Sequence, residues 1–87
     1  MLSISRFAPI AEAVIALADQ QLAGRGDADG VAVVLEGERA AELERQYRAA
    51  PERTEQLLRY SVEEWAEPHP AIRKFSLRFG TVSLFLR

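Results

Sequence analysis

The sequence has no cysteine, one histidine and one lysine among its 87 residues. The absence of cysteine excludes disulfides, thiolate nucleophiles and cysteine-based zinc sites. Because His69 is the single imidazole, neither a Ser-His-Asp triad nor a Cys-His pair finds support. We therefore expect a protein that is not an enzyme and that holds no metal and no cofactor.

Long hydrophobic runs are also missing, because no segment approaches the roughly 18 apolar residues of a membrane span. Ala13–Ala18 is apolar and ends in an Ala-x-Ala pattern, as secretion signals do, but Pro9 and Glu12 interrupt the region. The apolar fraction of 48% and the charged fraction of 28% are typical of a globular domain. We expect a cytoplasmic protein, without membrane association, that folds as a single domain over residues 1–87.

The C-terminal residues predict a β-hairpin with a defined register. Ile72–Phe79 and Val82–Arg87 both alternate, and Gly80-Thr81 between them suits a two-residue type II′ turn. Side chains alternate with period 2, so this turn fixes which residues share a face. One face receives three apolar pairs: Phe79–Val82, Leu77–Leu84 and Phe75–Leu86. The other face receives Arg78–Ser83, Ser76–Phe85 and Lys74–Arg87.

Three segments upstream of the hairpin have helical periodicity. Phe7–Ala23 carries a wide apolar stripe, Glu38–Ala50 carries a narrow one, and a third helix begins at Pro51 and ends before Pro68. The stripe widths predict that the first helix is the main core helix and that the second is the most solvated. On this basis Ile15→Ala should destabilise the protein more than Leu43→Ala.

Val31–Leu35 is a continuous apolar run, which predicts a strand that is buried on both faces. Met1–Ser5 alternates and is either a short strand or a frayed end. The sequence therefore predicts an α+β two-layer sandwich, with a three- or four-stranded mixed sheet and three helices on one face. The expected order is (β)-α-β-α-α-β-β. Val31–Leu35 must flank the hairpin at an edge, which Met1–Ser5 or another chain would cover.

The net charge of −2 is unevenly distributed. Residues 1–71 hold 13 acidic and 7 basic side chains, a balance of −6, whereas residues 72–87 hold 4 basic and no acidic ones, a balance of +4. A large apolar residue, Phe85, lies on the otherwise polar face of this basic hairpin. The predicted binding residues are Phe85, the basic residues Arg73, Lys74, Arg78 and Arg87, and Val34 of the neighbouring strand.

One loop has part of the spacing of a calcium site. Asp27-x-Asp29 is followed by Glu38 at the twelfth position of such a loop. Val31 stands where an oxygen ligand is needed, and Ala32 stands where glycine makes the sharp turn. The loop is therefore interpreted as a solvated turn and not as a metal site.

These features favour a small non-enzymatic protein-binding module that acts through its sheet face or edge. It would form a homo-oligomer or a stoichiometric complex, with a second copy or a foreign protein as partner. Bacterial or phage inhibitors, antitoxins, immunity proteins and complex subunits are classes of this size and composition. The alternative is a nucleic-acid-binding protein that uses the basic hairpin, with phosphates on its cations and a base stacked on Phe85.

Overall fold

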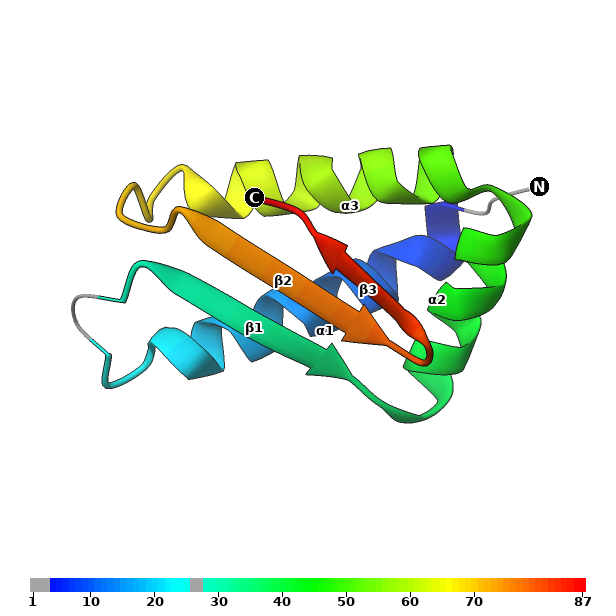
Figure 1. Cartoon of the computed structure of the whole chain (residues 1–87), viewed down its shortest axis with the longest axis horizontal. Helices are drawn as coiled ribbons and strands as arrows, with labels where there is room; N and C mark the ends of the chain where they lie inside the picture. Colours follow the sequence, from blue (N-terminus) through cyan, green and yellow to red (C-terminus); the bar gives the residue numbers. More distant parts are fainter. Residues whose placement is uncertain (1–3, 26–27) are drawn as a thin grey trace.

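The computed structural model describes residues 4–25 and 28–87, which form three helices and three strands (Figure 1). In chain order these are α1 (Ile4–Leu22), β1 (Gly30–Leu35), α2 (Gly37–Ala49), α3 (Pro51–Ala66), β2 (Lys74–Phe79) and β3 (Val82–Phe85). The predicted α+β class and the order of the elements are confirmed. Within the described ranges, no helix combines the length and the apolar character needed to cross a membrane.

The segment Met1–Ser5, which the sequence left open as a short strand or a frayed end, is helical in its described part. Ile4 and Ser5 already belong to α1, and the rest of that segment, residues 1–3, lies outside the described residues. Pro9 is therefore inside the helix and not in its first residues. A proline at this position removes the hydrogen bond to the carbonyl four residues earlier, and its ring crowds that carbonyl.

The sheet has the order β1-β2-β3, with β1 parallel to β2 and β2 antiparallel to β3. The predicted edge position of Val31–Leu35 is thus confirmed. A parallel pair needs a long crossover, which α2 and α3 together supply. No strand pairs with the outer side of β1 in the part of the chain that the structure describes.

The hairpin has the predicted register over four pairs: Phe79–Val82, Arg78–Ser83, Leu77–Leu84 and Ser76–Phe85. Gly80 has a φ of 59°, and no other described residue except Gly24 and Gly37 has a positive φ. Thr81 therefore has a negative φ, which distinguishes the type II′ turn from type I′.

The register changes after Phe85. The Leu86 N–H donates to the Phe75 carbonyl at 2.8 Å, but the Phe75 N–H donates to the Arg87 carbonyl at 3.3 Å. The Leu86 carbonyl instead accepts a hydrogen bond from Arg59 of α3, at 3.3 Å. The predicted Lys74–Arg87 pair is consequently absent from the ladder, because a helix side chain takes the carbonyl that would have continued it.

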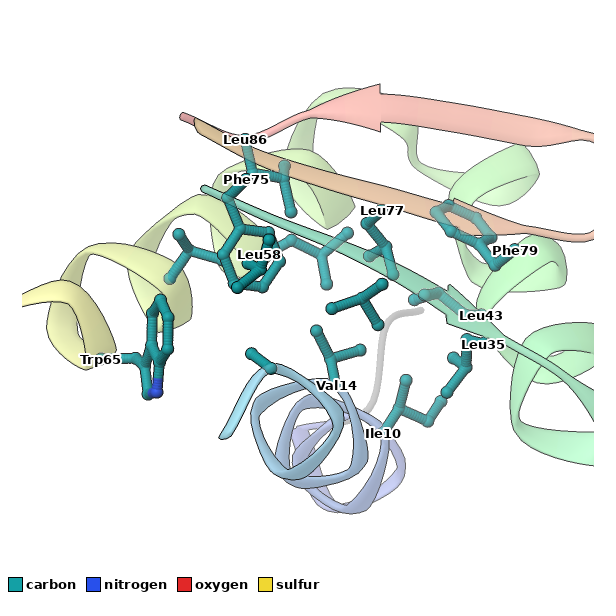
Figure 2. Packing of buried hydrophobic residues seen from close by; sticks show 14 of the residues in the cluster. Ile10, Val14, Leu35, Leu43, Leu58, Trp65, Phe75, Leu77, Phe79 and Leu86 are labelled. Carbon is teal, nitrogen blue, oxygen red and sulfur yellow. The ribbon is translucent and has the colours of Figure 1, made fainter. Parts of the chain in front are cut away.

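All three helices pack on the same side of the sheet. In Figure 1, α1 and α3 lie behind the strands, and α2 crosses the end that carries the hairpin turn. Figure 2 shows Ile10 and Val14 of α1 pointing toward the sheet, from which Phe75, Leu77 and Phe79 point back. These residues belong to one continuous apolar core.

The one-sided packing corrects the prediction for β1, which is not buried on both faces. Val31, Val33 and Leu35 are buried, whereas Ala32 and Val34 are exposed. A run of apolar residues satisfies either arrangement, and the helices cover only one face. The other face of the sheet is left to solvent.

α2 has the narrow apolar stripe that the sequence predicts, but this stripe is more deeply buried than the prediction of a solvated helix implied. Leu43 is fully buried, with 0% of its surface exposed, and Ala40 is buried beside it. The Tyr47 ring meets Phe79 edge-on at 5.9 Å between centroids. In contrast, Ile15 of α1 only partly enters the core. The narrow stripe of α2 lies deep because the helix closes one end of the sheet.

The burial reverses the expected order of the two alanine substitutions. Leu43→Ala should cost about 2–5 kcal/mol, the usual range for truncating a fully buried leucine, and Ile15→Ala should cost less. Urea denaturation monitored by Trp65 fluorescence would measure both. Equal or inverted costs would show that α2 does not pack as described.

A polar contact joins α2 to the hairpin turn. The Glu44 carboxylate accepts hydrogen bonds from Arg48 at 2.8 Å and from the Thr81 hydroxyl at 2.7 Å. The hydrogen bond from Arg48 is the main cause that lowers the pKa of Glu44 below 4.5, and the bond from Thr81 is the next. Because Glu44 also lies against Gly80, any side chain at Gly80 would overlap with this carboxylate.

A lowered pKa in the folded state means that the contact stabilises the protein at pH values above 4.5. This contribution is lost as the pH falls through the folded-state pKa. In a ¹³C-NMR titration, the Glu44 midpoint should lie below 4.5 and should rise in Thr81→Val, which removes the hydroxyl. Thr81→Ser keeps the hydroxyl and should leave the midpoint unchanged. A midpoint that Thr81→Val does not move would exclude the contact.

Candidate functional site

The face of the sheet that the helices leave uncovered is the candidate site. We call it the open face, and it turns toward the viewer in Figure 1. It presents the side chains that alternate with the buried ones along the three strands. Its residues are Ala32 and Val34 of β1, Lys74, Ser76 and Arg78 of β2, and Ser83 and Phe85 of β3.

Phe85 is the most exposed large apolar residue of this face, with 77% of its surface accessible. It shares a cross-strand row with Ser76 and Ala32. Since both neighbours are small, the ring stands above them and forms the wall of a hollow of about 340 Å³. Arg59 of α3 fixes the backbone of Phe85, because the Phe85 carbonyl accepts a hydrogen bond from the Arg59 side chain at 3.1 Å.

Basic side chains surround this hollow. Lys74 and Arg87 line it together with Phe85, and Arg25 of the loop after α1 approaches from the β1 side. Gly30 also lines the hollow, and it allows the close approach of Lys74, because a Cβ there would lie only 3.0 Å from the Cβ of Lys74. One carboxylate, Asp29, is among the described lining residues. The hollow is therefore apolar on one side and cationic around much of its rim.

The structure places the six predicted binding residues in three positions. Phe85, Lys74 and Arg87 meet at the hollow. Val34 and Arg78 are cross-strand partners in the next row of the open face, where Val34 is 52% exposed. Arg73 precedes β2, is exposed, and is not among the residues that line the hollow.

Arg87 also contacts the helical layer. Its Nε atom lies 3.6 Å from a carboxylate oxygen of Glu63 on α3. At this distance, and with both side chains partly exposed, the ion pair is weak. Arg87 therefore remains available to a ligand on the open face.

Sequence reasoning missed several parts of the site. Ala32 and Ser76 form the floor beside Phe85 but were not named as site residues, although the hairpin register had already paired Ser76 with Phe85; Ala32 follows only once β1 is paired with β2. Arg25 and Asp29 come from the loop that precedes β1, and no pattern in the sequence indicated that they reach the hollow. Periodicity describes strands and helices, but it does not place loop side chains.

Gln21 of α1 occupies the middle of the edge of β1. Its side-chain amide donates to the Ala32 carbonyl, and its Oε1 atom accepts from the Ala32 N–H at 3.0 Å. The Gln21 amide thus makes the two hydrogen bonds that a neighbouring strand would make with Ala32, whose backbone groups point away from β2. A strand that added to this edge would first have to displace Gln21. Access is therefore easier at the open face than at the edge.

The remaining motifs have structural explanations. His69 packs against Trp65, with ring centroids 4.7 Å apart. Asp27, which belonged to the loop with partial calcium-site spacing, lies outside the described residues. Among the described residues there is no group of three His, Cys, Asp or Glu side chains that could hold a metal ion.

Comparisons of this chain with protein-family models, with curated proteins and with solved structures find no match.

Replacement of Gln21 tests the protection of the edge. In Gln21→Ala, the Ala32 amide loses its acceptor and should exchange with solvent at least about tenfold faster. The Val33 amide, which faces β2, should keep its protection and serves as the internal control. Hydrogen exchange followed by NMR would measure both sites. Unchanged exchange at Ala32 would show that Gln21 does not close the edge in solution.

Proposed function

We propose that the protein is a non-enzymatic binding module that holds an acidic surface of another protein on its open face, with Phe85 as the anchor. The observation that carries this proposal is the 77% exposure of Phe85 on a sheet face that no described element covers. An exposed aromatic ring next to arginine and lysine is typical of interface anchors, which bury apolar area when the partner docks.

The charges of the open face select the partner. Lys74 and Arg78 make no ion pair with any described residue, and the ion pair of Arg87 is a long one. A symmetric sheet-to-sheet dimer would place one basic face against another basic face, which is unfavourable. An acidic surface that carries an apolar side chain would instead neutralise the cations and cover the ring.

The composition of the hollow supports binding over catalysis. Among its described lining residues, Asp29 is the one carboxylate, so a pair of carboxyl groups for acid–base chemistry is not assembled there. The single histidine packs against Trp65 and is not part of the lining. The groups that do meet there are cationic, aromatic and small, which suits recognition.

Nucleic-acid binding is the second candidate, and a specific observation favours it. Phe85 stands beside a floor of small residues with Lys74 and Arg87 at the rim, so a base stacked on the ring would have cations near its phosphate. The net charge of −2 opposes this function, since nucleic-acid-binding domains are usually basic. The two candidates differ in salt dependence, because binding to nucleic acid releases counterions and weakens steeply with salt.

Affinity capture from the native host would test the proposal with three baits. The wild type should recover a stoichiometric protein partner, and Phe85→Glu should recover at least about tenfold less of it. Tyr60→Glu is the matched control, because Tyr60 on α3 is 67% exposed but lies outside the open face. This variant should bind the partner as the wild type does.

Circular dichroism and thermal unfolding should first show that both variants are folded. A partner that Phe85→Glu retains, or that Tyr60→Glu loses equally, would contradict the proposal. Recovery of nucleic acid that is removed by moderate salt and by Phe85→Glu would instead establish the second candidate.

A further inference from the structure

A groove with the opposite charge lies between α1 and α3. It has a volume of about 460 Å³, and among the described residues its lining includes none from the sheet and none that is basic. Ala11, Ile15, Ala16 and Trp65 give it an apolar floor and wall, and Glu12, Asp19 and Glu64 give it three carboxylates. An apolar groove with an acidic rim is the chemical complement of the open face.

The two helices that form this groove are held together by a hydrogen bond. The Trp65 indole N–H donates to the Asp19 carboxylate at 2.8 Å, which links α3 to α1 across the groove. Trp65 also meets Phe75 of the core edge-on, with centroids 5.5 Å apart. In Figure 2 the Trp65 side chain lies between α3 and α1. The groove is therefore a fixed feature of the helical layer.

Charge is distributed unequally between the two surfaces. On α2 and within α3, acids pair with arginines of their own helix, as in Glu42–Arg45, Glu44–Arg48 and Glu55–Arg59. Glu12 and Glu64 have no ion pair with the described residues, and the same holds for Lys74 and Arg78 on the open face. The side chains left without a local counter-charge thus include acids at the groove and bases on the sheet.

We propose that a second copy of this chain occupies the groove. Phe85 of one copy enters the α1–α3 groove of the next, with Lys74 and Arg78 facing Glu12 and Glu64. This inference rests on the proposed function, and it names the acidic partner surface as the chain's own groove. The contact joins unlike surfaces, so it avoids the cation repulsion of a symmetric sheet-to-sheet dimer.

The position of the two surfaces determines the type of assembly. The open face is on the sheet side of the molecule, and the groove is on the helical side (Figures 1 and 2). Each copy therefore carries both surfaces, the open face and the groove. Because the two surfaces differ, the contact is heterologous and repeats from copy to copy. The assembly grows with concentration and does not stop at the dimer, unless the rotation between copies closes a ring.

Two variants that each remove one surface provide a direct test. Phe85→Ser removes the anchor, and the double variant Glu12→Lys/Glu64→Lys reverses the rim of the groove. Sedimentation velocity up to about 1 mM should show the wild type growing beyond the dimer, since that concentration populates contacts with Kd values in this range. Each variant alone should be a monomer. Gln56→Ser changes an exposed residue of α3 that lines neither the groove nor the hollow, and as the control it should assemble as the wild type does.

A mixture of the two variants should form a 1:1 dimer and nothing larger. The intact groove of Phe85→Ser accepts the intact face of the double variant, and the remaining surfaces cannot pair. A symmetric interface predicts no such complementation, so an absent dimer in the mixture would overturn the proposal. Assembly of the double variant at wild-type strength would overturn it as well, because the groove would not be the acceptor.

The outcome is separable from that of the proposed function. A wild type that stays monomeric over the whole concentration range would exclude the head-to-tail contact. In that case the loss of a host partner from Phe85→Glu, but not from Tyr60→Glu, would still support binding by the open face. Wild-type assembly by Phe85→Ser would exclude Phe85 as the anchor of self-association.

Discussion

The packing of three helices against a single face of a three-stranded sheet is the constraint from which the other features follow. β2 is the central strand, and its buried side chains Phe75, Leu77 and Phe79 fill the core between the sheet and the helices. A chain of 87 residues forms a modest core, and in this protein the core covers one side of the sheet. The second side of the sheet is consequently uncovered, and its side chains do not belong to the core.

Long polar side chains from the helices form hydrogen bonds with backbone groups at the two edges of this sheet. Gln21 bonds both backbone groups of Ala32 on β1, and Arg59 bonds the carbonyls of Phe85 and Leu86 at the end of β3. Exposed edges invite pairing with other chains, and side chains that satisfy the edge groups reduce that tendency. The proposed contact through the open face is made by side chains, which give more selectivity than backbone hydrogen bonds alone.

The sequence predicts a feature of this structure best when the residues that determine the feature lie close together in the chain. The hairpin register follows from Gly80 and a period of two, both of which lie within the segment that they describe, and four of its pairs are confirmed. The failure at Arg87 has a distant cause, because Arg59 of α3 takes the carbonyl of Leu86.

Burial was less predictable than secondary structure. The run Val31–Leu35 is compatible with burial on one face or on two, and the number of helices available for covering decides between them. The width of the stripe on α2 says how many residues face inward, but not how deep Leu43 lies. In the candidate site, alternation placed Phe85, Lys74 and Arg78 on one face. The hollow itself depends on Gly30 and on loop residues that only the tertiary structure brings near.

Alternation along the hairpin places its core residues and the proposed binding residues on opposite faces. Phe75 and Phe79 are fully buried on one side of the same ribbon whose other side exposes 77% of Phe85. The backbone under Phe85 is fixed by its pairing with Ser76 and by Arg59, while the ring itself packs against little. A rigid backbone that carries a free aromatic ring lowers the entropic cost of docking, because little has to be ordered when a partner arrives. Substitutions on the open face should therefore alter association while the core, built from the alternate positions, keeps its packing.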